Sequence, residues 1–290
     1  MTQRSKIEDG QVLLRQEDAR LVLDPAHGGA IREFSCLGHD VLRHSAAGAV
    51  DPFELACFAM VPYVNRIVDG RFACGAHSVQ LQRNWSLDPH PLHGQGWRAP
   101  WQVAEVSGAE ATLRFDGGGN EWPWRYRAEQ HLRLSRSALT VRLSVENLSA
   151  SPMPVMLGLH PYFGDAARAT LEAHAPRVWK SDRAALPIEE VPAPPAWSFE
   201  SGRRVAAVPL DNCFTQWDGK AVVRWTDRVL TLRATNCRFL HVFVPPGGDF
   251  FCMEPQTAAT GAFNRDRSEV SLVQPGERFA IRVSLDLEVS

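Results

Sequence analysis

The sequence has no run of about 18 to 20 apolar residues, the length that a helix needs to span a bilayer. Its first residues, MTQRSKIEDGQ, are polar and lack the apolar core of a secretory signal. An excess of either charge is also missing, because 31 basic and 33 acidic side chains give a formal net charge of -2. No positive field therefore draws the chain to nucleic acid or to an anionic membrane. We expect a cytoplasmic protein whose partner is a small molecule.

Cysteine is scarce, and the six residues present form no CxxC pair: Cys36, Cys57, Cys74, Cys213, Cys237 and Cys252. Cysteines so dilute and scattered do not make a disulfide framework, so we expect them to be small buried apolar side chains. Disorder is excluded, because 44% of the residues are hydrophobic and 22% are charged. A chain of 290 residues could hold two domains, although all-β domains often reach this length alone.

Long stretches of helical periodicity are absent as well. Apolar residues instead alternate with polar ones in segments 126–134, 141–146 and 279–289, and on both sides of residues 226–228. Clusters of turn-forming residues separate such segments at 116–120, 245–249 and 274–277. This pattern predicts an all-β fold of mostly antiparallel strands with few short helices, forming a single domain over residues 1–290.

The proline-rich stretch 187–195 is the one candidate for a linker between domains. The strand pattern continues beyond it, and the composition on its two sides is similar. We therefore predict that this stretch is a surface loop.

Polar side chains gather in four segments rich in glycine, proline and aromatic residues, namely 62–72, 91–97, 158–163 and 251–257. Each segment holds a few ionisable or strongly hydrogen-bonding groups between rigid neighbours, which is typical of a shaped pocket. Aromatic rings pack on the apolar face of a sugar, whereas its hydroxyls need charged or amide partners. The combination favours a carbohydrate site.

Each candidate residue also has a plain structural interpretation. His160 could be a core histidine whose ring nitrogens have hydrogen-bond partners. Arg66 could hold a loop in place through backbone carbonyls, and Asp211 before Asn212 could form an Asx turn. Glu254 is harder to explain in this way, because burying a carboxylate is costly unless it is paired or its pKa is raised.

Other reaction signatures are weak. His90 and His93 could suggest a metal pair, but Pro91 prevents helical spacing and no further ligand stands nearby, so we predict no metal. There is no GxSxG motif, and the glycines at 117–119 lead into NEWP, which indicates a hairpin turn instead of a phosphate loop. Asp211 and Glu254 are the only pair of acids that a glycosidase could use.

Five motifs, in this order, resemble the aldose 1-epimerase (mutarotase) family: NRI-x-DG-x-F at 65–72, LHGQGW at 92–97, LHPYF at 159–163, LDNCF at 210–214 and MEPQT at 253–257. The resemblance implies a β-supersandwich of the galactose mutarotase type, without a metal or organic cofactor. It also implies an aldose as substrate, while the sequence leaves open whether the chain is a monomer or a homodimer.

The resemblance also implies roles for single residues. It makes His160 the general acid near the sugar ring oxygen and Glu254 the general base on the anomeric hydroxyl, with His93 at the same end of the sugar. The remaining residues predicted to bind the substrate are Arg66, Asp211, Asn65, Trp97, Tyr162 and Phe243. The stretch after His-Gly in LHGQGW, and the residue before His-Pro in LHPYF, differ from those of galactose-specific members. The chain is closer to a less characterised bacterial branch, and its preferred aldose is left open.

These side chains suit anomer exchange, which removes the proton of the C1 hydroxyl and protonates O5. An imidazole with a pKa of about 6.5, and a carboxylate whose pKa a pocket raises from about 4.3, can both change protonation near neutral pH. Two alternatives stay open. A hexose-6-phosphate epimerase would need a further basic group, for which Arg71 and Arg98 are candidates. A sugar-binding or sugar-sensing protein would bind without turnover.

Overall fold

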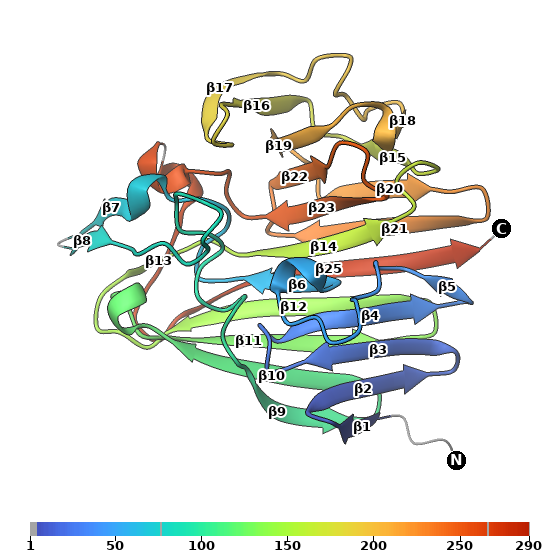
Figure 1. The fold of residues 1–290 in the computed structure, drawn as a ribbon. Helices are drawn as coiled ribbons and strands as arrows, with labels where there is room; N and C mark the ends of the chain where they lie inside the picture. Colours follow the sequence, from blue (N-terminus) through green and yellow to red (C-terminus); the bar gives the residue numbers. More distant parts are fainter. Residues whose placement is uncertain (1–4, 76, 266, 290) are drawn as a thin grey trace.

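The protein consists of two large antiparallel sheets packed face to face (Figure 1). The computed structural model describes residues 5–75, 77–265 and 267–289. The first sheet, from edge to edge, contains β1 (Ser5–Glu8), β2 (Gln11–Gln16), β3 (Ala19–Asp24), β4 (Ala30–Cys36), β6 (Cys57–Met60), β14 (Gly158–Gly164), β23 (Phe250–Gln256), β22 (Phe239–Val244), β19 (Leu210–Thr215), β16 (Arg177–Ser181) and β17 (Pro187–Pro192), with β5 (His39–Asp40) paired to β4.

The second sheet contains β18 (Arg203–Arg204), β15 (Thr170–Ala173), β20 (Lys220–Arg224), β21 (Arg228–Thr235), β25 (Arg278–Val289), β12 (Ala138–Asn147), β11 (Tyr126–Leu134), β10 (Glu110–Gly117) and β9 (Gln102–Ser107). Two smaller pairs join β7 (Arg71–Cys74) to β8 (His77–Gln80) and β13 (Met153–Val155) to β24 (Ser271–Val273). The helices of the described residues are 3-10 turns: η1 (Pro52–Glu54), η2 (Val68–Gly70), η3 (Gly119–Glu121), η4 (Val205–Ala207), η5 (Ala262–Asn264) and η6 (Arg267–Glu269).

The prediction of a mostly antiparallel all-β fold with few short helices is confirmed. Alternation explains the second sheet well: in β25, Ile281, Val283, Leu285 and Leu287 are buried while the residues between them are more exposed. One cluster of buried apolar side chains runs through both sheets, from Val12 to Leu287. This continuous core supports the single domain over residues 1–290, which stays a prediction.

The prediction of a surface loop over 187–195 is wrong for its first part. Residues Pro187–Pro192 form β17, which pairs with β16 at the edge of the first sheet. Proline lacks the backbone N–H that a central strand needs, but an edge strand tolerates it on the side that faces away from its neighbour. The prolines therefore mark a sheet edge here and not the absence of a strand.

The central strands of the first sheet are buried on both faces. In β14 the first six residues are buried, and in β23 the last six. One face packs against the second sheet, and Figure 1 shows η1 and the long segment between β6 and β9 in front of the other face. Side chains that alternate away from the core therefore lie beneath this cover, where the candidate site is found.

Five of the six cysteines are buried and Cys74 is half-buried, and all are free thiols. This largely confirms their predicted role as small apolar side chains. In the part of the chain that the structure describes, no helix has the length and apolar character required to cross a bilayer. The cytoplasmic location stays a prediction.

Candidate active site

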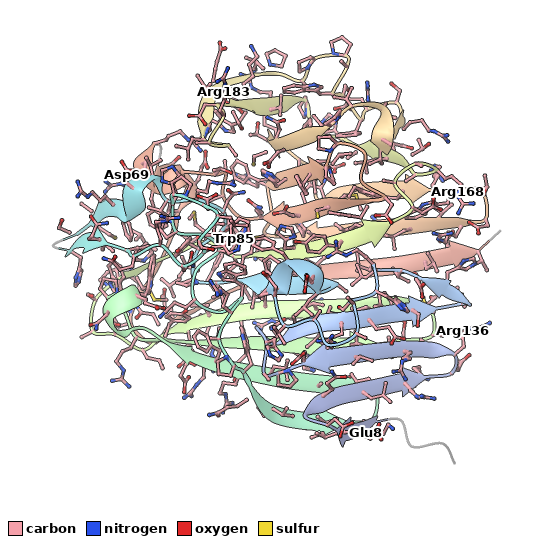
Figure 2. All side chains as sticks on the ribbon, viewed as in Figure 1. Glu8, Asp69, Trp85, Arg136, Arg168 and Arg183 are labelled. Carbon is pink, nitrogen blue, oxygen red and sulfur yellow. The ribbon has the colours of Figure 1, made fainter. Side chains whose placement is uncertain are left out.

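A cavity of about 190 Å³ lies over the central strands of the first sheet. Period-two alternation brings its ionisable groups to one face, because β14, β23, β22 and β19 follow one another in the sheet. Two lining residues that are two positions apart come from β14 and two from β22, and β19 and β23 contribute one each. Chain segments before β9 supply the opposite wall, and Figure 2 shows Trp85 on the part of the chain that crosses in front of the sheet. The cavity is lined by Phe53, Asn65, Arg66, Trp85, Leu92, His93, His160, Tyr162, Asp211, His241, Phe243 and Glu254.

His160 and Glu254 form a pair at the floor of the cavity. Nε2 of His160 lies 3.2 Å from Oε1 of Glu254, and their side chains are 8% and 3% exposed. The other oxygen of Glu254 accepts a hydrogen bond from Nε2 of Gln256 at 2.9 Å. Burial raises the pKa of Glu254 to about 7, although the positive charge of His241 opposes the shift. Burial, with a smaller effect of His241, lowers the pKa of His160 to about 3.

These pKa values correct one expectation, since His160 does not titrate near neutral pH on its own. Two groups in direct contact share their protons, so the pair titrates as a unit. Between pH values of about 3 and 7 the pair holds one proton. It loses this proton above about pH 7 and binds a second one only below about pH 3.

The ring of His160 is held in a stack of aromatic groups. Phe58 and Tyr162 both stack against it, with ring centres 4.6 Å and 4.7 Å from that of His160. The guanidinium of Arg43 lies over Tyr162 at 4.0 Å and donates a hydrogen bond to the backbone oxygen of Phe53 at 2.7 Å. The stack fixes the plane of the imidazole, so that Nε2 faces Glu254. Among the described atoms, Nδ1 of His160 is buried without a hydrogen-bond partner.

His93 is oriented by its own loop. Its Nδ1 accepts a hydrogen bond from the backbone N–H of Asn65 at 3.2 Å, and its backbone N–H donates to the oxygen of Asn65 at 3.0 Å. Burial and the neighbouring His160 hold the pKa of His93 well below its ordinary value, so the ring is neutral. Because Nδ1 is an acceptor, the ring proton lies on Nε2, which can donate to a ligand.

The loop conformation that positions His93 is sterically demanding. Asn65 and His93 both have positive φ angles, 51° and 54°, and Gly94 follows with a φ of 77°. A Cβ atom on Gly94 would lie 2.1 Å from the backbone oxygen of Val61. Only glycine therefore allows the two segments to approach this closely.

Arg66 is anchored by a carboxylate that the sequence interpretation missed. Its Nε donates to Oδ2 of Asp88 at 2.8 Å, and its Nη1 donates to Oδ1 of Asn65 at 3.1 Å. Oδ1 of Asp88 accepts the backbone N–H of His90 at 2.8 Å. The sequence signal for Asp88 is that of an Asx turn, which says nothing of a distant arginine.

Asp211 is partnered by a second missed residue, His241. Their Nε2 and Oδ1 atoms lie 2.8 Å apart, and the side chain of Asp211 is 44% exposed. Burial alone would raise the pKa of Asp211, but the hydrogen bond from His241 and its charge lower it below the ordinary value. The one sequence signal for His241 is a lone histidine in the apolar strand FLHVFV.

Eight of the nine predicted site residues line the cavity, namely His160, Glu254, His93, Arg66, Asp211, Asn65, Tyr162 and Phe243. Trp97 does not. It is 1% exposed and packs behind the cavity wall, with its ring centre 5.1 Å from that of Phe53 and 5.5 Å from that of His93. Its Nε1 donates to the oxygen of Gly94 at 3.1 Å, so the turn that presents His93 folds this ring inward.

The lining also contains four residues that sequence reasoning did not single out: Phe53, Trp85, Leu92 and His241. Phe53 and Trp85 are in contact, with ring centres 4.6 Å apart. They come from separate segments, so no local motif joins them.

The donor groups of the site do not suit a metal ion. His160, Cys252 and Glu254 offer donor atoms within 4.8 Å of one another. Burial, followed by the charge of Glu254, raises the pKa of the Cys252 thiol well above its ordinary value, whereas a metal ligand must be a thiolate. The rings of His90 and His93 each accept a hydrogen bond from a backbone N–H at Nδ1, and in this way they stabilise loops.

Comparisons with known proteins agree with this geometry. The family described as "Aldose 1-epimerase" matches residues 10–286. Protein YphB of Escherichia coli (strain K12), which is uncharacterized, is 29% identical over 247 residues, covering 81% of this chain and 84% of that protein.

Two crystal structures have the same fold. An Escherichia coli K12 protein matches with a TM-score of 0.89 and 28% identity, over 96% of this chain and 98% of that one. A galactose mutarotase-like protein from Clostridium acetobutylicum matches with a TM-score of 0.85 and 20% identity, over 97% and 95%. The family match extends over nearly the whole chain and includes every residue of the cavity. This protein belongs to the aldose 1-epimerase family.

Proposed function

We propose that this protein is an aldose 1-epimerase that interconverts the α and β anomers of a free aldohexose. The observation that carries the proposal is the 3.2 Å contact between His160 and Glu254 inside the cavity. In a pyranose, O1 and O5 are both bonded to C1, so the acid and the base that act on them must be close neighbours. A sugar that binds with its C1 atom beside this pair has the acid and the base within reach at the same time.

The proton balance of the reaction fits a pair that holds one proton and one vacant site. The pKa values place this proton mostly on Glu254, so the reactive form is the minor one in which His160 carries it. In that form the imidazolium of His160 gives its proton to O5, and ionised Glu254 takes the proton of O1. The C1–O5 bond breaks with its electron pair going to O5, and O1 becomes the carbonyl oxygen. The pair is left as neutral His160 and protonated Glu254, which is the same proton count distributed differently. After rotation about C1–C2, the reverse transfers close the ring as the other anomer.

Three groups around the pair are suited to binding hydroxyls. The Nε2–H of His93 is a donor at the same end of the cavity, with ring centres of His93 and His160 5.5 Å apart. Arg66 and Asp211 supply a cation and an anion, each with a fixed partner. Phe243 and Tyr162 offer apolar faces to the C–H groups of the sugar. These roles form the binding part of the proposal.

The charges of the cavity favour an unphosphorylated sugar. Among the residues that the structure describes, Arg66 is the one arginine of the lining, and Asp88 and Asn65 already occupy two of its donors. Arg71 donates to Gln80 and Arg98 donates to the backbone of Asn84, and neither lines the cavity. A phosphate would therefore lack the extra cation that recognition of a dianion calls for.

A role in binding alone does not explain why the base has a pKa raised to about 7 next to an imidazole. Burying such a pair costs stability, and neutral amides would bind hydroxyls at a lower cost.

The proposal is tested by polarimetry of freshly dissolved α-D-glucose, α-D-galactose and glucose 6-phosphate, each with and without the protein. We expect the rotation of a free aldose to reach its equilibrium value much faster with the protein, and glucose 6-phosphate to respond less. A protein that binds these sugars without accelerating any of them would contradict the proposal and support the sugar-binding alternative. Acceleration of the phosphate alone would support the hexose-6-phosphate alternative.

A further inference from the structure

His241 is the remaining ionisable group of the cavity, and the proton balance above does not use it. It is 5% exposed and lies on β22, where its Cα is paired directly with that of Glu254 on β23. On its other side, β19 brings Asp211 to a distance of 2.8 Å from Nε2. The imidazole therefore lies between two carboxylates on the adjacent strands, one of which is the proposed base.

We propose that His241 is a positioning residue that holds a positive charge between Asp211 and Glu254, and thereby sets the pH range in which the His160–Glu254 pair is active. The inference rests on the proposed function for its effect on rate, while the charge on His241 is independent of turnover.

The surroundings of His241 favour the charged form. The ionisable groups that interact with it are Asp211 and Cys213 of β19, Glu254 of β23, His160 of β14, and His93 of the covering segments. Arg66 acts on its two carboxylate neighbours, Asp211 and Glu254. Burial by itself lowers the pKa of His241, but Glu254 and the hydrogen bond to Asp211 raise it well above the ordinary value.

One contact could argue for a neutral ring, since Nδ2 of Asn65 lies 3.5 Å from Nδ1 of His241. That distance is longer than an ordinary hydrogen bond. Oδ1 of Asn65 already accepts two bonds from Arg66, which leaves the amide nitrogen, a donor, facing Nδ1 of His241 at this long distance. The short hydrogen bond to Asp211 is therefore the contact that determines the protonation state of the His241 ring.

The first test is the pH profile of kcat/KM for His241→Gln, which removes the charge but retains a polar side chain. Loss of a nearby cation makes protons bind more tightly to the pair. We expect the midpoint of the decline on the alkaline side to move up by about 1 to 3 pH units. His131→Gln is the matched control, because His131 pairs with Glu110 at 3.1 Å on the exposed surface, and its profile should not move. A lower rate with an unmoved midpoint would overturn the proposal.

The second test does not require turnover. NMR titration of histidine-labelled protein, with His241 assigned from the spectrum of the variant or of Asp211→Asn, reports the charge of the ring directly. We expect an imidazolium that persists well above the pH at which an ordinary histidine loses its charge, and a pKa lowered by about 1 to 3 units in Asp211→Asn. A ring that is neutral at about pH 7 would overturn the proposal even if the protein is an active epimerase. If no sugar is turned over, the proposed function fails, and this titration still decides the charge of His241.

Discussion

Asp88 is the residue through which the binding role of Arg66 can be tested most sharply. The substitution Asp88→Asn keeps an oxygen for the backbone N–H of His90, which Oδ1 accepts at 2.8 Å. It removes the charge that holds Nε of Arg66 at 2.8 Å. Side-chain exposures of 16% for Arg66 and 6% for Asp88 mean that water screens this pair little.

The size of the effect follows from the kind of bond that is lost. A hydrogen bond between charged groups contributes about 1.5 to 3 kcal/mol. If that energy fixes Arg66 against the sugar, its loss weakens binding by about 10- to 100-fold. The contact to a hydroxyl is equal in the ground and transition states, so KM should rise by about that factor while kcat changes little.

The assay is the initial rate of mutarotation over a range of sugar concentrations, with Asp116→Asn as the control. Asp116 also accepts a hydrogen bond from the Nε of an arginine, Arg127, at 2.7 Å, but its side chain is 57% exposed and does not line the cavity. The control should have unchanged KM and kcat. A folded Asp88→Asn protein with the KM of the unmodified protein would refute the role given to Arg66.

Three further predictions concern the pair and its supports. The kcat/KM should fall as pH rises through about 7, because the raised pKa of Glu254 marks the loss of the proton that the pair must carry, and a flat profile from about pH 6 to 9 would contradict this. Phe58→Ala should lower the free energy of unfolding by about 3 to 5 kcal/mol in denaturant titration, because the fully buried ring supports His160. Gly94→Ala should cost at least about 1 to 3 kcal/mol and reduce activity, since its Cβ would clash with Val61; unchanged stability would show that the turn can relax.

Most of the fold could be predicted from the sequence, because one face of the second sheet is exposed to solvent and its strands therefore alternate between apolar and polar residues. Alternation identified residues 126–134, which form β11, and the turn expected at 226–228 lies one residue earlier, at 225–227, between β20 and β21. It could not identify β17, where edge prolines look like a loop. Strands that are buried on both faces, such as β14, show no alternation of apolar and polar residues. The sequence singled out such segments through their motifs alone.

Site residues that stand in a short motif could be predicted from the sequence. Residues that act as partners of a side chain distant in the sequence could not. His160 and Glu254 each stand in a short distinctive segment, and both line the cavity. Asp88 and His241 act through residues that are 22 and 30 positions away, so no local pattern records them. Trp97 shares a motif with His93, but the turn between them places the ring of His93 at the cavity and packs the ring of Trp97 behind it, with ring centres 5.5 Å apart.

The measurement that tests the central claim most directly is the rate of mutarotation of Glu254→Gln beside the unmodified protein and Glu110→Gln. The substitution at Glu254 keeps the shape and the hydrogen-bonding capacity of the side chain, but the amide has no site for the proton of O1. We predict a rate lower by about 100- to 10,000-fold with sugar binding retained, and no change for Glu110→Gln, whose carboxylate is 43% exposed on the second sheet. A Glu254→Gln protein as fast as the unmodified one would contradict the account.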